Sequence, residues 1–318
     1  MIKYENEINK RKKDKKLSIK VLAIINPASG KGNITEHIDE IRNNLKNQDM
    51  EMDLYLTKKE YNAKKIVEDN IEGKDLILVC GGDGTLNEVV TAFMEKEIKD
   101  VTVAYIPLGT TNDLAKSLEM PIKDISITKR LLQSKAKVID IGEFNNKKYF
   151  CYVAAFGVMT DVSYMTSQKL KNKYGRFAYY MKAIKEIVKI PTYKVKIKYD
   201  DEELEGEFIY GGISNSASIA GFEWFDRNEI SLEDGKFECI FIRKPKNLSG
   251  YFKILTAYRE KDYSWNRDIV YFKANKIQIE TEEEVAWTLD GEFAGRLNNV
   301  NIENCNKALE LAVCEKSK

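Results

Sequence analysis

Histidine is nearly absent from this chain of 318 residues, in which His37 is the only example. His37 lies beside the apolar stripe of a predicted helix, Thr35–Leu45, and away from every glycine-rich turn. Catalytic triads that depend on histidine and histidine-rich metal sites are therefore excluded. The five cysteines are odd in number and include no C-x-x-C pair, so we expect reduced thiols, most of them inside apolar runs. They are Cys80, Cys151, Cys239, Cys305 and Cys314.

The chain also lacks long hydrophobic runs and an excess of charge of either sign. No stretch approaches the ~18 consecutive apolar residues of a transmembrane helix, and the N-terminus has no apolar segment typical of a signal peptide. The 51 basic and 50 acidic residues give a net charge of +1, which does not favour nucleic-acid binding. We therefore expect a cytoplasmic protein without a nucleic-acid partner, long enough for two domains.

Glycine is concentrated in three turns that each follow an apolar run and precede a helix-like stretch. Backbone N–H groups at neighbouring strand ends can converge on one phosphate chain, so the three turns together predict a nucleotide site. The turns are Asn26–Gly32 after Ile19–Ile25, Gly81–Asn87 after Leu76–Cys80, and Pro107–Asp113 after Val101–Ile106.

The second turn, Gly81–Asn87, has the composition of a phosphate site. Its three glycines have no Cβ, so the chain can turn sharply and phosphate oxygens can approach the main chain. Asp83 would repel these oxygens unless Mg²⁺ lay between them, and Mg²⁺ prefers carboxylate and phosphate oxygens. We expect Thr85 to cap a helix over Leu86–Met94, whose positive end then faces the ligand. A tight turn that binds nothing is the alternative.

The first turn, Asn26–Gly32, is not a P-loop. Lys31 is followed by Gly32, and no glycine stands five residues before Gly30. Ser29, Gly30 and the N–H groups around them can nevertheless hold the phosphates of a nucleotide.

Strand-like and helix-like segments alternate up to residue 136, which predicts a doubly wound parallel sheet with ligands at the carboxyl ends of its strands. From residue 137 β-like runs predominate and predict a β-sandwich-like second domain. We expect the cleft between the two domains to hold the active site. The predicted division is a basic tail over 1–16, a nucleotide-binding α/β domain over 17–136, a β-rich substrate domain over 137–300, and a segment over 301–318 that can return to the first domain.

Two β-hairpins are expected in the second domain. One turns at Asn145–Asn146, and the other pairs Lys194–Tyr199 with Glu207–Ile213 across an acidic turn.

Two segments are candidates for contact with a membrane surface. Lys10–Lys16 holds six basic residues against Asp14, which indicates either a solvated tail or weak attachment to an anionic leaflet. The amphipathic helix over Phe177–Val188 either packs on a sheet or lines an acyl-chain groove, with basic residues nearby. Peripheral association with the inner face of the membrane is thus an expectation that the sequence leaves open.

Four motifs in a fixed order carry a family resemblance. They are N-P-x-S-G-K-G from Asn26, G-G-D-G-T-L-N-E from Gly81, P-L-G-T-x-N-D-L-A from Pro107, and D-G-E over Asp290–Glu292. This set resembles the bacterial branch of the diacylglycerol kinase family, whose nucleotide domain is similar to that of NAD kinases. The resemblance implies an ATP- and Mg²⁺-dependent kinase acting on the hydroxyl of a membrane lipid, most commonly diacylglycerol giving phosphatidic acid.

The resemblance also implies roles for acidic residues. Glu292 is expected to accept the proton of the lipid hydroxyl, while Asp290, Asp83 and Asp113 hold Mg²⁺ and its waters on the phosphates. Spacing alone does not decide between Asp290 and Glu292 as the acceptor, because Gly291 lets either side chain turn inward. The expected nucleotide site comprises Asn26, Pro27, Ala28, Ser29, Gly30, Thr57, Gly81, Gly82, Asp83, Gly84, Thr85, Leu86, Asn87 and Thr110.

The loop Ser231–Phe237 resembles the place where family members hold a structural Mg²⁺. Asp234 would supply a carboxylate, and Ser231 and Lys236 would supply main-chain carbonyls. An ordinary Asp-Gly turn between strands is the alternative. The sequence departs from the family pattern at Tyr61–Ala63, near Thr57, and at Ile219–Phe222, where many relatives are richer in glycine.

Two other functions are weighed against the lipid kinase. An NAD kinase shares the G-G-D-G-T turn, but the third turn and D-G-E fit lipid kinases better. A regulatory protein that binds nucleotide and lipid without turnover is disfavoured because every expected acid is present. The sequence leaves open which lipid is used and whether the chain forms a homodimer.

Overall fold

The computed structural model describes residues 18–29, 38–48, 50–122, 124, 126, 128–131, 134, 136–157, 191–219 and 222–314. Several sequence predictions concern residues outside these ranges. They are the basic tail, His37, the nucleotide-binding role of Gly30 and the amphipathic helix over Phe177–Val188.

Four parallel strands form the sheet of the N-terminal domain, in the order β2-β1-β3-β4. Almost every residue of β1, β3 and β4 that lies inside the sheet is buried, as expected when helices cover both faces. The strands are β1 (Ile19–Ile25), β2 (Met50–Leu56), β3 (Leu76–Gly81) and β4 (Thr102–Pro107).

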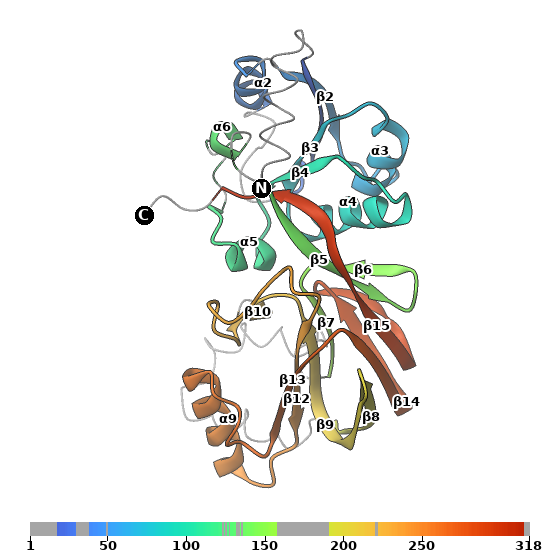
Figure 1. Ribbon diagram of the computed structural model, residues 1–318, viewed down its shortest axis with the longest axis vertical. Coiled ribbons are helices and arrows are strands. Elements are labelled where there is room, and N and C mark those ends of the chain that lie inside the picture. Colours follow the sequence, from blue (N-terminus) through green and yellow to red (C-terminus); the bar gives the residue numbers. More distant parts are fainter. Residues whose placement is uncertain are drawn as a thin grey trace, which may run out of the picture.

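The helices of this domain pack in two pairs. α3 (Ala63–Asn70) packs against α4 (Asp83–Glu95), and α2 (Ile38–Lys46) packs against α6 (Thr128–Leu131). Figure 1 shows the two pairs on opposite sides of the parallel strands. The short helix α5 (Asp113–Ser117) follows the third glycine-rich turn and contacts the β-rich domain through β10.

The β-rich domain consists mainly of antiparallel strands around an aromatic core. β9 pairs with β7 and β8, and both of these pair with β14, so the pairing closes on itself. Phe144, Phe156, Phe241 and Trp287 meet inside this ring. The elements are β5 (Ala136–Phe144), β6 (Lys148–Phe150), β7 (Val153–Gly157), β8 (Tyr193–Tyr199), β9 (Glu202–Ser214), β10 (Ser218–Ile219), β11 (Phe222–Glu223), β12 (Phe237–Arg243), α9 (Leu248–Glu260), β13 (Ile269–Ala274), β14 (Lys276–Leu289) and β15 (Glu292–Ala312).

The hairpin predicted at Asn145–Asn146 is confirmed: both residues are left-handed, with φ of 51° and 58°, and they join β5 to β6. The partner predicted for Lys194–Tyr199 is largely wrong. β8 pairs with Glu202–Phe208, because the turn needs only Asp200 and Asp201. The remainder of β9 pairs instead with β7 and β12.

β15 joins the two domains. Its first half pairs with β14, its second half pairs with β5, and Leu311 and Ala312 lie parallel to Val103 and Ala104 of β4. Among the described residues the strands of both domains therefore belong to one sheet of 13 strands, and the expected sandwich-like packing takes the form of a sheet that curls on itself.

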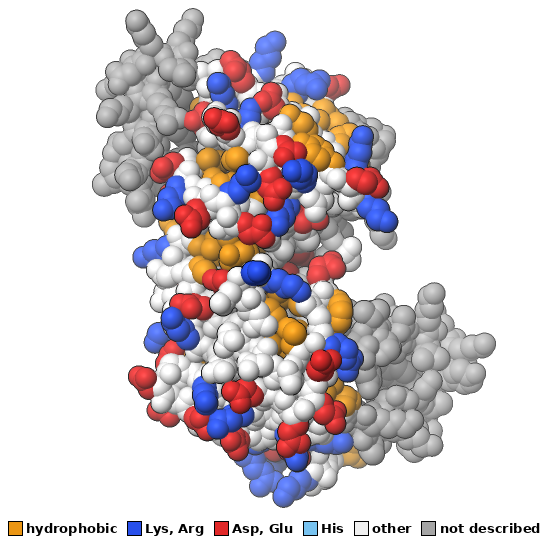
Figure 2. Space-filling view, turned by 90° about the vertical axis from the view of Figure 1, so that its right-hand side faces the viewer, with side chains coloured by type: hydrophobic (Ala, Val, Ile, Leu, Met, Phe, Trp, Pro, Cys, Tyr) orange, Lys and Arg blue, Asp and Glu red, His pale blue; other side chains and the backbone are white. Residues whose placement is uncertain are grey.

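Acidic and basic side chains are interspersed over both domains on the face shown in Figure 2, in keeping with the net charge of +1. Within the described residues, no helix combines the length and apolar character needed to cross a membrane.

Candidate active site

The second glycine-rich turn leads directly into α4. Gly82, with extended backbone angles, is the N-cap, and the helix begins at Asp83. The predicted start at Leu86 with Thr85 as the cap is wrong, because the extended backbone of Gly82 ends the turn three residues earlier without any side-chain cap. Leu86 is a core residue whose N–H donates to the carbonyl of Gly82. The turn thus offers a ligand the first N–H groups of α4, which have no partner within the helix.

Thr85 joins the first and second turns. Its Oγ1 accepts a hydrogen bond from Nδ2 of Asn26, at the end of β1, over 2.8 Å. The Oδ1 of Asn26 in turn accepts from the N–H of Ala28 at 3.0 Å. A Cβ on Gly81 would lie 2.6 Å from the Cβ of Thr85, so this approach requires glycine. Asn26 therefore fixes the described part of the first turn, in which Pro27 and Ala28 are exposed.

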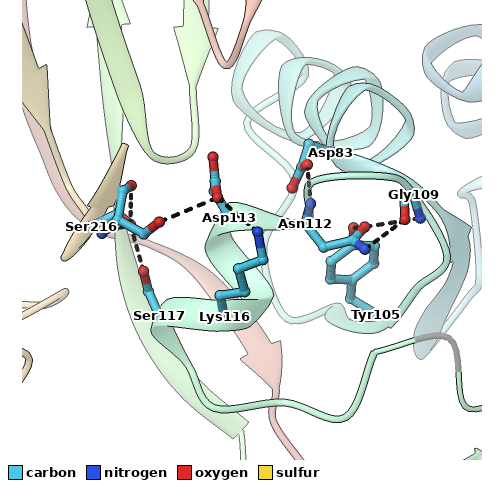
Figure 3. A network of polar contacts seen from close by, with 9 residues as sticks. Asp83, Tyr105, Gly109, Asn112, Asp113, Lys116, Ser117 and Ser216 are labelled. Carbon is cyan, nitrogen blue, oxygen red and sulfur yellow. Dashed lines mark hydrogen bonds and ion pairs between the residues drawn. The ribbon is translucent and has the colours of Figure 1, made fainter. Parts of the chain in front are cut away.

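The second and third turns touch backbone to backbone. A Cβ on Gly109 would lie 2.6 Å from the Cα of Gly82. Asn112, which is fully buried and left-handed, fixes the third turn: its Oδ1 accepts from the N–H of Gly109 at 2.9 Å, and its Nδ2 donates to the carbonyl of Gly109 at 2.8 Å (Figure 3). The hydroxyl of Tyr105 also donates to Asn112 Oδ1, at 3.3 Å.

Two further predicted nucleotide contacts, Thr57 and Thr110, lie beside these turns. Thr57 follows β2, and its N–H donates to the carbonyl of Ile25 at 2.9 Å. Thr110 is exposed in the third turn. Both positions are accessible at the carboxyl ends of the parallel strands.

Asp83 lies where the second and third turns meet. Its Oδ2 accepts the N–H of Asn112 at 2.7 Å, while its Oδ1 is buried and has no hydrogen-bond partner. Burial raises the pKa of Asp83 to about 6, the nearby Asp113 and Asp290 raise it further, and the bond from Asn112 opposes the rise. An unpaired buried carboxylate oxygen is costly unless a ligand satisfies it, and a divalent cation fits this oxygen.

Asp113 lies at the contact between the two domains. It is fully buried at the start of α5, with Lys116 Nζ 3.4 Å from its Oδ1. The hydroxyl of Ser218, in β10, donates to the same oxygen at 3.3 Å. Beside this contact the hydroxyls of Ser117 and Ser216 share a hydrogen bond of 2.5 Å (Figure 3).

The sequence interpretation missed these serines. Ser214 Oγ accepts the N–H of Ser216, and Ser216 Oγ accepts that of Ser218, both at 3.1 Å. The alternation of Ser214, Ser216 and Ser218 along the chain was an available signal, because side chains two residues apart in extended chain lie on the same face.

Asp290 and Gly291 form the turn between β14 and β15, and both are left-handed. The carboxylate of Asp290 is buried and accepts four hydrogen bonds. Three come from consecutive backbone N–H groups, those of Cys151, Tyr152 and Val153, at 2.7 to 3.1 Å. The fourth comes from Nδ2 of Asn87 at 2.9 Å. Burial raises the pKa of Asp290, and these four donors oppose the rise.

Asn87 therefore binds the second domain in this structure. Besides Asp290, its Nδ2 donates to the carbonyl of Tyr149 at 2.9 Å. It links α4, which starts at the second glycine-rich turn, to the D-G-E turn.

Glu292 differs from Asp290 in its surroundings. It is the first residue of β15 and is exposed. Its Oε1 lies 3.9 Å from the position that a Cβ on Gly84 would occupy, so the carboxylate faces the second glycine-rich turn. The fold thus brings D-G-E to the second glycine-rich turn, although about 200 residues separate Asn87 from Asp290 in sequence.

Comparisons with known proteins agree with this geometry. Residues 20–144 match the family model described as the diacylglycerol kinase catalytic domain. A diacylglycerol kinase of Staphylococcus carnosus is 32% identical over 91% of this chain and 93% of its own length. One from Bacillus subtilis is 31% identical over 86% of this chain and 90% of its own length. This chain belongs to the diacylglycerol kinase family.

A solved structure agrees. The crystal structure of a diacylglycerol kinase from Bacillus anthracis is 25% identical, with a TM-score of 0.72 over 94% of this chain and 98% of that one. The two proteins share the fold of both domains, and the chain is an enzyme of the lipid kinase class.

The predicted structural Mg²⁺ loop of this kinase adopts a tight local conformation. Asp234 Oδ1 accepts the N–H of Lys236 at 3.0 Å, and Ser231 Oγ accepts that of Glu233 at 3.3 Å. Within the described part of the chain no three acidic, cysteine or histidine side chains come together as a metal site. A metal at Ser231, Asp234 and Lys236 stays a prediction.

Asp140, which the sequence interpretation did not single out, holds this loop from β5. Its Oδ2 accepts the N–H of Gly235 at 2.7 Å, and its Oδ1 accepts that of Lys307 at 2.7 Å. Nδ2 of Asn306 donates to the same Oδ1 at 3.1 Å. Asp140 thus ties the loop to β15.

Proposed function

We propose that this protein is an ATP- and Mg²⁺-dependent lipid kinase that transfers the γ-phosphoryl group of ATP to a lipid hydroxyl, with diacylglycerol as the substrate. The observation that carries the proposal is the unpaired, buried Oδ1 of Asp83 at the contact between two glycine-rich turns. The names of the relatives support the choice of lipid.

The turns suit the phosphates of ATP. The N–H groups at the start of α4 point out of the helix, and the positive end of the helix dipole favours an anion there. Gly82 and Gly109 leave no side chain between their backbones, so a phosphate can approach both turns.

Asp83 and Asp113 are the residues that would hold Mg²⁺. The first has an unpaired buried oxygen, and the second is a buried carboxylate on the neighbouring turn. Bound there, Mg²⁺ would neutralise charge on the phosphates during transfer. Lys116, beside Asp113, adds a positive charge from the protein itself.

Glu292 is the residue that we propose accepts the proton of the lipid hydroxyl. Both oxygens of Asp290 already accept hydrogen bonds, whereas the carboxylate of Glu292 is exposed and faces the turn of Gly84. A positioned general base accelerates such a transfer by about 10² to 10⁴. Asp290 then acts as a positioning residue that holds the turn carrying Glu292.

A single assay tests the proposed reaction. Purified protein is incubated with labelled ATP, Mg²⁺ and mixed micelles of diacylglycerol, or with NAD in their place. Label in phosphatidic acid is the expected result. Label in NADP, or ATP binding without transfer to any acceptor, would contradict the proposal.

The Asp83→Ala variant is the control for the site. It should keep the fold, since Asp83 is the first residue of α4 and is only partly buried, and should lose turnover. Substantial activity in a folded Asp83→Ala protein would rule out the assigned role.

The identity of the lipid is tested by a screen of acceptor classes. Diacylglycerol, ceramide, a sphingoid base and a polyprenol all present a hydroxyl, and we expect diacylglycerol to give the highest kcat/KM. Access to such an acceptor places the enzyme at a membrane surface during turnover.

A further inference from the structure

A polar cavity lies at the N-terminal end of α9, in the β-rich domain. Its volume is about 290 Å³, and its lining includes Lys246, Asn247, Lys253, Trp265, Asn266 and Arg267. Figure 1 shows α9 at the end of this domain that is farther from α4 and α5, so the cavity is separate from the kinase site. We propose that this cavity binds the phosphate of an anionic phospholipid and that α9 docks the protein on a negatively charged membrane.

Hydrogen-bond donors converge on the cavity. α9 begins after Asn247, whose Oδ1 accepts the N–H of Gly250 at 3.1 Å. The N–H groups of the two preceding helical residues, Leu248 and Ser249, have no partner within the helix, as at every helix start. This end of a 13-residue helix carries the positive end of the helix dipole, which favours an anion.

Asn266 supplies an independent sign of a ligand. Its side chain is 5% exposed and lines the cavity, and its Nδ2 has no hydrogen-bond partner. Its Oδ1 accepts the N–H of Asp268 at 3.0 Å, which fixes the orientation of the amide, because only the oxygen can accept. A buried amide donor without an acceptor is costly, and a phosphate oxygen in the cavity would satisfy it.

The charges of the lining favour an anion. Lys246, Lys253 and Arg267 contribute three positive charges, and Asp268 contributes one negative charge. The net positive lining and the amide donor together match a phosphate group better than a neutral ligand.

The outer surface of α9 favours a lipid as the source of that phosphate. Leu248, Phe252 and Leu255 follow one another at helical spacing and are 48%, 68% and 57% exposed. The opposite side of the helix, with Ile254 and Ala257, is buried against the domain. An apolar stripe facing outward beside basic residues is typical of a helix that lies in a membrane interface.

Trp265 extends this surface. It lines the cavity and is 44% exposed. Tryptophan is enriched at membrane interfaces, where the ring contacts acyl chains at the level of the headgroups.

Vesicle sedimentation tests the proposal without ATP or substrate. The full chain should sediment with vesicles of phosphatidylcholine and phosphatidylglycerol, and far less with phosphatidylcholine alone. Each basic residue near an anionic surface strengthens binding about fivefold, so Lys253→Ala/Arg267→Ala should weaken it by about 25-fold. Equal binding of this double variant and the wild type would overturn the proposal.

Lys194→Ala/Lys198→Ala is the matched control. It removes the same charge from exposed positions on β8, away from the cavity, and should change vesicle binding by no more than about twofold. An equal loss in this control would mean that net charge alone, and no site at α9, attracts the protein.

Two further variants separate the parts of the site. Asn266→Asp keeps the oxygen that accepts from Asp268 but replaces the donor with a second oxygen, so binding should weaken strongly. Phe252→Ser/Leu255→Ser changes only exposed side chains, and should release the protein from vesicles even at low salt. Retained binding by this last variant would contradict membrane docking through α9.

Calorimetry with inorganic phosphate and sedimentation velocity complete the test. Saturable phosphate binding that Arg267→Ala abolishes, with vesicle binding unchanged, would assign the cavity to a soluble phosphate instead. A dimer that Phe252→Ser/Leu255→Ser dissociates would assign the apolar stripe to a second copy. Turnover of a short-chain, water-soluble acceptor should be the same in all these variants, so failure here is distinguishable from failure of the proposed kinase reaction.

Discussion

The hydroxyl of Ser218 donates a hydrogen bond of 3.3 Å to the carboxylate of Asp113, across the contact between the β-rich domain and α5. Asp113 is thereby oriented by a side chain from the other domain. A change at Ser218 therefore reaches Asp113 in the candidate site without altering the glycine-rich turns.

Ser218→Ala should lower kcat while the KM for the lipid stays the same. A hydrogen bond to a charged group contributes about 1.5 kcal/mol, which corresponds to roughly a tenfold effect. Steady-state kinetics and the affinity for nucleotide with Mg²⁺ are the measurements. Ser117→Ala, which removes the neighbouring hydroxyl contact with Ser216, should have a smaller effect. Equal kinetics of Ser218→Ala and the wild type would show that Asp113 needs no such support.

Gly109→Ala should destabilise the protein by about 2 kcal/mol or more and abolish ATP binding. The new Cβ would lie 2.6 Å from the Cα of Gly82, and neither backbone can move without opening one of the two turns. Urea unfolding and nucleotide binding check this.

Gly73→Ala is the control for backbone strain alone. Gly73 has a φ of +70° but no atom within 4 Å of a Cβ, so its substitution should cost about 1 kcal/mol and leave ATP binding unchanged. If Gly109→Ala behaves like Gly73→Ala, close contact of the turns is not what binds ATP.

The stability of the protein should fall as the pH rises through about 6 because of Asp83. The folded state holds the proton of this carboxyl up to a pKa of about 6, whereas its ordinary value is 3.8, so the folded state binds more protons between these values. This contribution is fully present below about pH 4 and is lost above about pH 6.

Asp83→Asn removes this pH dependence. Between about pH 4 and pH 7, the free energy of unfolding of the wild type should fall relative to that of the variant by roughly 3 kcal/mol at most. Urea unfolding of both proteins across this range is the measurement, and parallel profiles would contradict it.

Asp290→Asn and Glu292→Gln should separate structure from chemistry. In the first variant the amide NH₂ replaces an oxygen that accepts hydrogen bonds from the N–H groups of Cys151, Tyr152 and Val153. At least one of these donors then loses its acceptor, so we expect the free energy of unfolding to fall by about 2 kcal/mol or more. In the second, an exposed side chain changes, so stability should stay within about 0.5 kcal/mol while kcat falls by about 10² to 10⁴. Thermal unfolding and kcat, measured together, distinguish these outcomes. A fully active Glu292→Gln would exclude it as the proton acceptor.

The parts of the fold that follow from local sequence were predictable. Apolar runs followed by glycine-rich turns predicted β1, β3 and β4 and the positions of their turns. Asn145–Asn146 predicted a hairpin because asparagine tolerates the left-handed conformation. The start of α4 was not predictable to the residue, since the cap at Gly82 has no side chain and leaves no polar signal.

Features that depend on distant parts of the chain were not predictable. Glu292–Ala312 forms a single strand of 21 residues, which its alternating charges and asparagines did not indicate. The strand depends on pairing of its two halves with different partners, β14 and β5. The four donors to Asp290 and the bond between Ser218 and Asp113 join residues more than 100 positions apart. The resemblance of the motifs predicted the acidic residues of the site. Only the fold shows that both carboxylate oxygens of Asp290 already accept hydrogen bonds.

Because β15 pairs with strands of both domains, it restricts how the two domains of this enzyme can move relative to each other. The strand runs from Glu292 to its pairing with β4, so a movement of one domain relative to the other must bend a paired strand and cannot pivot on a loose linker. The pairing of β15 with β5 is interrupted between Cys305 and Leu309, where Lys307 is left-handed, and this is the place where bending costs least. Because the carboxylate of Asp140 accepts the N–H of Lys307 at that point, this one side chain restrains the bending of β15 there.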